Sequence, residues 1–131
     1  MAKTAIHSDA APAALGPYAQ AVRAGNTLYL SGQIGLDPQT GELKAGFEAQ
    51  LDQVFENLTA VATAAGATLD DAVKFTVFLT DLAHFGAVND KMAALLRPPY
   101  AARAAVQVAA LPKGAVVELD AILVLDDAPT A

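Results

Sequence analysis

The chain has 131 residues, and its 8 Lys and Arg against 14 Asp and Glu give a formal net charge of −6. This acidic balance argues against a nucleic-acid-binding protein, because phosphate contacts need clustered cations. Cys is absent, which excludes disulfides, thiolate metal ligands and a Cys nucleophile. No apolar run approaches the about 20 residues of a membrane-spanning helix, and residues 1–10 lack the apolar stretch of a secretory signal. We therefore expect one small cytoplasmic domain over residues 1–131.

The first part of the chain predicts two short strands. Residues 1–10 and the tail beyond Leu125 show no pattern and are expected to be loose. The strand candidates at 19–24 and 27–31 flank Gly25-Asn26, a dipeptide typical of a tight turn. We therefore expect a direct connection between these two strands.

The next segment predicts a helix. A loop is expected at 37–42 from its Pro, Asp and Gly content. Over 45–65 the apolar residues recur at steps of four and three, which is the spacing of one face of an amphipathic helix. Gly66 follows this pattern and predicts the end of the helix. The apolar stripe consists of Phe47, Leu51, Val54, Leu58 and Val61.

A strand and a second helix are predicted after it. Residues 72–80 alternate between the two faces expected of a strand. Asp81 is the predicted N-cap of a helix that Pro98-Pro99 ends. The shared face of the strand consists of Val73, Phe75, Val77 and Leu79, and that of the helix of Phe85, Val88, Met92 and Leu95.

Two further strands, at 103–109 and 115–125, complete the predicted order of strand, strand, helix, strand, helix, strand, strand. This order predicts an α/β (α+β) sandwich with a mixed sheet. Two helices cover only one face of such a sheet. The other face still carries apolar side chains, so we expect a partner subunit to cover it, by default in a symmetric homo-oligomer. These side chains are Phe78, Val116, Ile122 and Val124.

Two charged residues are the leading candidates for chemistry. Arg103 is one of three arginines and opens a strand whose neighbours are small or apolar. A guanidinium in that setting needs an anion, either an internal carboxylate or that of a ligand. Glu118 lies in the middle of a strand, where a carboxylate is unusual and needs hydrogen bonds. The alternative interpretation of Arg103 is an exposed or ion-paired structural arginine, and that of Glu118 is a salt bridge to Arg or Lys.

Four further residues give weaker signals. Ser31 and Gly32 stand at a strand end and offer a hydroxyl and an approachable backbone N–H, although Ser-Gly pairs usually only make turns. Tyr18 lies beside a proline and either closes over a pocket or simply packs. Asn89 lies in the second predicted helix, in a position typical of a surface polar residue.

The two histidines do not predict a metal site. His7 and His84 are widely separated and have no matching ligands nearby in the sequence. Neither belongs to an arrangement of Ser and Asp that would support a catalytic triad. We therefore expect no metal.

Four segments carry an ordered set of motifs. They are APAALGPYAQAV at 11–22, LYLSGQIGLDPQTGEL at 28–43, the stretch at 50–89, and ARAAVQVAALPKGAVVELDAI at 102–122. The order of GPY, SGQ, an Arg strand ending in V-A-x-L-P and a final E-x-[ED]-A is specific. On these motifs the chain resembles the Rid (reactive intermediate deaminase, YjgF-like) family, and specifically its RidA subfamily.

The resemblance implies a chorismate-mutase-like single domain with about six strands in a mixed sheet and two helices on one face. It implies a homotrimer with its sites between adjacent subunits. The implied activity is cofactor-free hydrolysis of carboxylate-bearing enamines and imines, such as 2-aminoacrylate, to 2-keto acids and ammonia. A non-catalytic trimer that binds small carboxylic acids is the alternative. A ribonuclease or translation inhibitor, proposed for relatives, is disfavoured by the acidic charge.

The resemblance also implies roles for the candidate residues. Arg103 would hold the substrate carboxylate with a two-pronged hydrogen bond, a geometry that Lys cannot copy. The backbone N–H of Gly32 would add a second contact to that carboxylate. Glu118 would position or activate the attacking water, with Ser31 nearby and Tyr18 closing the cleft.

The remaining candidates include departures from the family pattern. Ala105 stands where the family commonly has Cys, although only its backbone carbonyl would be needed, to accept a bond from the substrate nitrogen. Asn89 completes the substrate-binding set. The segment before Arg103 lacks the usual Pro and looks shortened, and Met92 replaces a common aromatic. These differences concern the mouth of the pocket rather than the carboxylate anchor.

Overall fold

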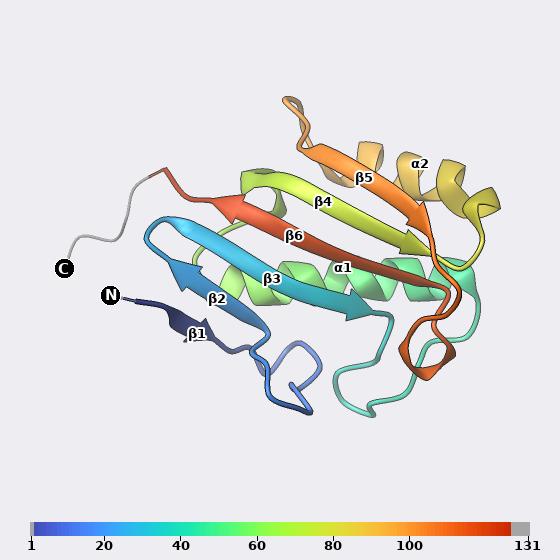
Figure 1. Ribbon diagram of the computed structural model, residues 1–131, viewed down its shortest axis with the longest axis horizontal. Coiled ribbons are helices and arrows are strands. Elements are labelled where there is room, and N and C mark those ends of the chain that lie inside the picture. Colours follow the sequence, from blue (N-terminus) through green and yellow to red (C-terminus); the bar gives the residue numbers. More distant parts are fainter. Residues whose placement is uncertain (1, 127–131) are drawn as a thin grey trace.

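A mixed sheet with the strand order β1-β2-β3-β6-β4-β5 forms one layer of the structure, a computed structural model that describes residues 2–126 (Figure 1). All neighbouring strands are antiparallel except β4 and β5, which are parallel. Of the predicted loose tail beyond Leu125, residues 127–131 lie outside the described residues. The strands are β1 Thr4–Ile6, β2 Ala21–Ala24, β3 Thr27–Ile34, β4 Ala72–Leu79, β5 Ala102–Gln107 and β6 Val117–Val124.

The second layer consists of the helices α1 (Phe47–Ala64) and α2 (Phe85–Leu95), which lie behind the sheet in Figure 1. Three short 3₁₀ helices, at Leu69–Asp71, Leu82–His84 and Pro112–Gly114, complete the connections. The expected α+β architecture with both helices on one face is confirmed. Within residues 2–126, neither helix combines the length and hydrophobicity needed to cross a bilayer.

Helix α1 presents the predicted apolar stripe to the sheet and packs on β3 and β6. Its four central members are fully buried, and only Phe47 remains partly exposed. The helix ends where predicted, because Gly66 takes the left-handed conformation (φ 77°) and its N–H bonds to the Thr63 carbonyl. The buried residues are Leu51, Val54, Leu58 and Val61.

The second helix differs from the prediction at both ends. The Asp81 side chain accepts a hydrogen bond from the N–H of Ala83 at 2.9 Å, so it caps a 3₁₀ turn that leads into α2. The expectation that Leu95 joins the core is wrong, since Leu95 is 51% exposed. Leu96 is buried in its place, because the helix stops and the chain becomes extended there (φ −111°, ψ 160°).

Two strand predictions also need correction. Residues 1–10 are not entirely loose, since Thr4–Ile6 pairs with β2 at the sheet edge. Three residues are too few to show an alternating pattern. Val73 is 48% exposed instead of facing the core, because the β4–β6 register shifts between Ala72 and Lys74. Such a bulge changes the alternation of the side chains at this point.

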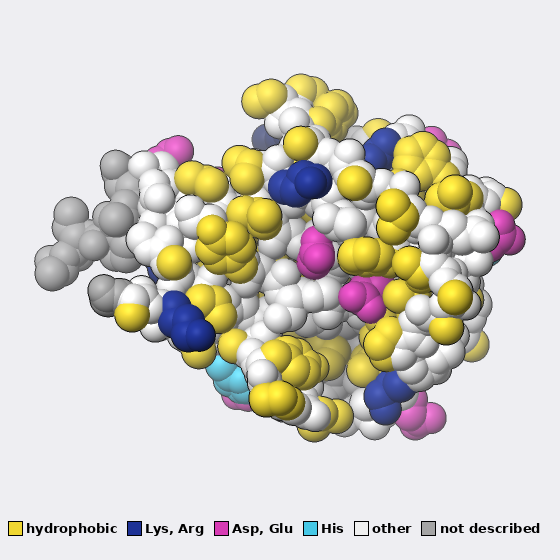
Figure 2. Space-filling model, in the orientation of Figure 1, with side chains coloured by type: hydrophobic (Ala, Val, Ile, Leu, Met, Phe, Trp, Pro, Cys, Tyr) yellow, Lys and Arg dark blue, Asp and Glu magenta, His cyan; other side chains and the backbone are white. Residues whose placement is uncertain are grey.

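The sheet face opposite the helices is open. Figure 2 shows hydrophobic side chains spread over this face, with acidic side chains near its centre. Phe78 and Ile122 are half-buried there, and Val124 is exposed. The prediction of an apolar face that one chain leaves uncovered is therefore confirmed. What covers it is considered below.

Candidate active site

Arg103 lies on β5 and points toward α2. It is the register partner of Phe75, whose side chain is buried beneath the helices. Its guanidinium lies 4.8 Å from the ring centre of Phe85, and its Nη1 donates to Oδ1 of Asn89 at 3.1 Å. The same nitrogen lies 3.7 Å from Sδ of Met92. No carboxylate of residues 2–126 lies within ion-pair distance of the guanidinium.

These contacts hold the guanidinium without neutralising it. A cation over an aromatic face and a hydrogen bond to a neutral amide both orient the group and leave its charge available. Ala105, two residues further along β5, lines an open hollow with Leu82, Phe85 and Arg103, which we call the arginine hollow. The structure therefore brings Arg103, Asn89 and Ala105 together at one end of α2.

Glu118 lies on β6 and faces the opposite, open side of the sheet. Its register partners are Phe78 on β4 and Ile34 on β3. Burial raises the pKa of the Glu118 carboxyl, and the negative charge of Asp120 on the same face raises it further. Within residues 2–126 no cation pairs with this carboxylate, so the salt bridge considered from the sequence is not found.

The backbone of β3 is shaped to accommodate this carboxylate. The β3–β6 register shifts between Leu30 and Gln33, which leaves Ser31 and Gly32 in an irregular stretch. A Cβ atom at Gly32 would collide with Oε2 of Glu118, so a residue with a side chain would displace the carboxylate. Only glycine allows this close approach without rearrangement.

The hydroxyl of Ser31 is hydrogen-bonded to the backbone of the neighbouring segment. It donates to the backbone carbonyl of Ala19 at 2.7 Å, and the N–H of Ser31 donates to the carbonyl of Gln20 at 3.0 Å. Both bonds tie β3 to the segment that follows Tyr18. In this arrangement Ser31 holds that segment in place, and its hydroxyl oxygen retains the capacity to accept a hydrogen bond.

Tyr18, Gly32 and Glu118 line a common hollow of about 180 Å³, which we call the glutamate hollow. Tyr18 is 56% exposed at its rim. Lys113 also lines it, from a turn in which this residue takes the left-handed conformation (φ 58°). The structure therefore brings together the carboxylate, the glycine backbone and the tyrosine that the sequence singled out.

Two residues that support the site, Gln20 and Phe85, were not predicted as such from the sequence. Gln20 is buried, and its amide accepts from the N–H of Ser8 at 2.6 Å and donates to the carbonyl of Pro12 at 2.8 Å, which clamps the loop before Tyr18. A glutamine within an apolar strand was the only signal for this role. Phe85 was predicted only as a core residue, because helical spacing does not show what lies across from it.

The arginine hollow and the glutamate hollow lie on opposite sides of one sheet. Arg103 shares the helix side with Phe75, whereas Glu118 shares the open side with Phe78. Neither of these two hollows, as residues 2–126 form them, contains both charged groups. A small molecule bound in one of these hollows would therefore meet the Arg103 guanidinium or the Glu118 carboxyl group, but not both.

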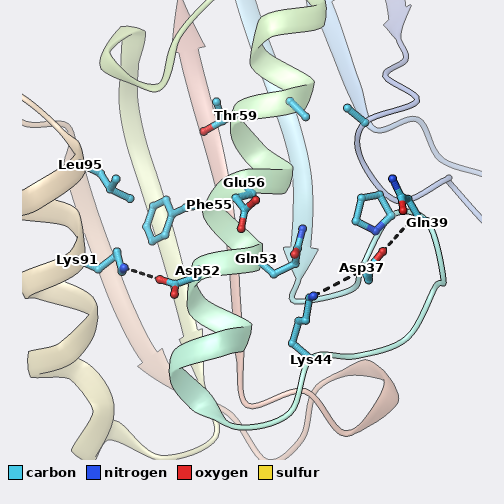
Figure 3. Close-up of a pocket in the computed structure, with 13 residues that line it drawn as sticks. Asp37, Gln39, Lys44, Asp52, Gln53, Phe55, Glu56, Thr59, Lys91 and Leu95 are labelled. Atoms are coloured by element: carbon cyan, nitrogen blue, oxygen red, sulfur yellow. Dashed lines mark hydrogen bonds and ion pairs between the residues drawn. The ribbon is translucent and has the colours of Figure 1, made fainter.

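Another hollow, of about 890 Å³, runs along the outer side of α1 (Figure 3). It contains none of the predicted site residues. Lys91 pairs with Asp52, and Lys44 pairs with Asp37 at 3.3 Å. Because both lysines of this groove already have carboxylate partners, it lacks an available cation for an anionic substrate.

The histidines take part in local contacts. His7 lies 2.8 Å from the Asp9 carboxylate near the surface, and the ring of His84 stacks on Phe47 with 4.0 Å between centres. Among residues 2–126, no three His, Asp or Glu side chains are grouped as a metal site would require.

Residues 8–125 match a protein-family model described as Endoribonuclease L-PSP. The crystal structure of RidA from the Antarctic bacterium Psychrobacter sp. PAMC 21119 is similar, with 58% sequence identity and a TM-score of 0.90 over 93% of this chain and 99% of that one. Protein DfrA of Myxococcus xanthus is 51% identical over 127 residues, 95% of this chain and 97% of DfrA. The 2-iminobutanoate/2-iminopropanoate deaminase of Mus musculus is 46% identical over 120 residues, 91% of this chain and 89% of the mouse protein.

Proposed function

Because the chain belongs to the Rid (YjgF-like) family, we propose that it hydrolyses reactive enamines and imines of the 2-aminoacrylate type to 2-keto acids and ammonia. The observation that carries the proposal is the Arg103 guanidinium, which Phe85 and Asn89 orient and which has no carboxylate partner among residues 2–126. We infer that the chain acts as a single cytoplasmic domain without a cofactor.

The first step is recognition of the substrate carboxylate. Nη1 of Arg103 is turned toward Asn89, so Nη2 and Nε present the two donors of a bidentate carboxylate contact. In a protein with a net charge of −6, an anionic substrate depends on such a local cation. The backbone N–H of Gly32 adds a second contact in this proposal.

The second step needs both hollows at one site. The open sheet face carries apolar side chains that water would otherwise contact, which supports a second copy packed against it. We propose a homotrimer in which the arginine hollow of one chain meets the glutamate hollow of the next. The substrate then binds between two subunits.

The chemistry is a hydrolysis that needs only proton transfer and water. A proton from solvent adds to the enamine carbon and gives the iminium ion. Water adds to the C=N carbon and loses a proton, and the resulting carbinolamine is protonated on nitrogen. It then expels ammonia, which takes up the hydroxyl proton as the keto group forms. Glu118 removes a proton from the attacking water and returns it to the departing nitrogen, and Tyr18 closes the cleft. A carboxyl with a raised pKa suits both transfers near neutral pH. The carbonyl of Ala105 accepts a hydrogen bond from the substrate nitrogen.

A non-catalytic trimer that binds small carboxylic acids is the second candidate. It is favoured by the separation of Arg103 from Glu118 within one chain, because the cation alone suffices for binding. A ribonuclease, which the family description names, is less favoured because the chain is acidic and lacks a basic patch for phosphates.

The test couples the purified protein to a threonine or serine dehydratase that releases the enamine, and follows formation of the keto acid. The wild-type chain should accelerate it. Arg103→Lys should lower kcat/KM about 10–100-fold, because losing a charged hydrogen bond costs about 1.5–3 kcal/mol. Arg97→Lys is the matched control, since Arg97 is exposed beyond α2 and lines neither hollow.

The contrary outcomes are distinct. An unchanged kcat/KM in Arg103→Lys would remove this residue from the mechanism. Calorimetry with 2-ketobutyrate separates the two candidate functions, because binding without any acceleration by the wild type supports the non-catalytic trimer. If the wild type shows no binding and no acceleration, both candidate functions are contradicted.

A further inference from the structure

The groove of about 890 Å³ on the outer side of α1 takes no part in the mechanism above. Figure 3 shows α1 along its middle, with Lys91 and Leu95 of α2 on one side and the loop that carries Asp37 and Lys44 on the other. We call it the α1 groove. It shares no lining residue with the arginine hollow or the glutamate hollow.

The charged side chains of the α1 groove leave one carboxylate without a partner. Asp52 pairs with Lys91, and Asp37 pairs with Lys44 at 3.3 Å. Glu56 lies one turn after Asp52 on the exposed side of α1, and no cation of residues 2–126 is within ion-pair distance of it. The lining of the α1 groove therefore keeps a net negative charge, which is available to a cation from outside.

Glu48 extends this negative charge along the helix. Glu48, Asp52 and Glu56 follow one another at intervals of four residues, which places them on one side of α1. The hydrogen bond to Asp52 raises the pKa of the Lys91 ammonium, and the charge of Glu48 raises it further. Because like charges at this spacing repel each other, a second cation bound across them would relieve a local repulsion.

The α1 groove also offers apolar surface. Leu95 is 51% exposed, because the chain becomes extended directly after it and turns Leu96 into the core in its place. Covering such a leucine removes apolar area from water and stabilises an association. The apolar lining of the groove consists of Ala10, Pro38, Phe55, Ala60 and Leu95.

We propose that the α1 groove docks a basic segment of another protein, which presents a Lys or Arg to Glu56 and an apolar side chain to Leu95. Charge complementarity selects a cationic occupant, and the apolar lining favours a protein segment over a small polyamine. The same carboxylates repel the phosphates of nucleic acids and of anionic lipids. The proposed trimer covers the open sheet face, whereas this groove lies on the side of the helices.

The probe is a synthetic helical peptide with Lys and Leu on one face, and calorimetry measures its Kd for the full chain. Glu56→Lys should weaken binding at least about tenfold, because it replaces attraction at the docking point by repulsion. Leu95→Ser should also weaken binding, since it removes apolar contact area.

Asp126→Lys is the matched control for Glu56→Lys. It makes the same change in net charge at an exposed residue outside the α1 groove. At about 0.15 M salt, charges separated by more than about 8 Å are largely screened, so this variant should keep the Kd of the wild type. Circular dichroism checks that all three variants are folded.

A wild-type Kd in Glu56→Lys, or an equal loss of affinity in Asp126→Lys, would overturn the proposal. Spermidine that binds as tightly as the peptide would overturn it too, as would a peptide with Ser in place of Leu that keeps its affinity. Either result would leave the apolar lining without a role. The binding is measured without substrate, so a failure of the proposed deaminase function would not alter these outcomes.

Discussion

At the scale of single residues, Arg103 and Glu118 of the proposed site have surroundings that differ in their effect on the charged form of the side chain. The Arg103 guanidinium contacts an aromatic ring and a neutral amide, and neither contact offsets its positive charge. Glu118 is half-buried beside Asp120, and both burial and that neighbouring charge favour its neutral form. In the proposed mechanism the first group therefore anchors the carboxylate and the second carries the proton.

Replacing Asp120 by Asn should shift the pH dependence of the reaction. The change removes the negative charge that raises the pKa of Glu118, while burial remains, so this pKa falls. Because Glu118 must be ionised to accept a proton from water, the acidic limb of the kcat/KM profile should move to lower pH. Measuring kcat/KM across the acidic range with the coupled assay gives the midpoint of that limb.

Asp126→Asn is the control for this shift. Asp126 is exposed beyond the other end of β6, so the same loss of charge occurs away from the glutamate hollow. Its midpoint should match that of the wild type. Equal midpoints in all three proteins would mean that Glu118 does not control the acidic limb.

At the scale of elements, α1 holds the two strand ends that border the glutamate hollow. Asn57 is fully buried, and its Nδ2 donates to the carbonyls of Leu36 at 3.0 Å and Ile34 at 3.3 Å. Oε1 of Gln50 accepts from the N–H of Val116 at 2.9 Å, just before β6. The polar residues of this helix therefore fix the end of β3 against the start of β6.

Asn57→Ala should destabilise the fold by about 1–3 kcal/mol, because it leaves two backbone carbonyls in a part-buried region without this donor. The free energy of unfolding is measured with urea at one fixed protein concentration. Thr63→Ala, an exposed change on the same helix, should stay within about 0.5 kcal/mol of the wild type. Equal stabilities for both variants would show that water replaces the lost donor.

The helices and strands also show which structural features a local sequence pattern predicts and which it does not. The stripe of α1 and its end at Gly66 follow from local spacing, whereas Asp81 caps the 3₁₀ turn before α2 and not α2 itself. The exposed Val73 does not follow from local spacing, because a bulge depends on the register with the neighbouring strand. Gln50 and Asn57 carry no periodic signal either, since their partners lie in segments distant along the chain.

At the scale of the whole molecule, one chain leaves both the sheet face and the proposed site incomplete. Glu118 of the glutamate hollow shares the open face with its register partner Phe78, whereas the arginine hollow lies on the side of the helices. In the proposed trimer, the subunit that covers the open face also brings its arginine hollow to the glutamate hollow. The proposed oligomeric state and the proposed activity therefore depend on each other.

Ile122→Glu should disrupt the proposed trimer, because it places a charge where the open face would be buried. Sedimentation should give three times 13.4 kDa for the wild type and a single chain for the variant. Deaminase activity should fall together with the mass. Thr63→Glu on the exposed side of α1 is the control, and it should keep the mass and the activity of the wild type. A wild type that sediments as one chain, or a monomeric variant with full activity, would contradict the intersubunit site.

The amino-acid sequence by itself determined the nature and order of the main elements, the family, and the identity of the candidate residues. These properties depend on local spacing and on short motifs, which are complete within a stretch of chain. Only the tertiary structure decided that Arg103 faces α2 while Glu118 faces the open side, and that Gly32 leaves room for the carboxylate. It also decided that Thr4–Ile6 forms an edge strand. The reason is physical: strand register, bulges and the direction of a side chain are set by hydrogen bonds and packing between segments far apart in the chain, whose pairing no local pattern specifies.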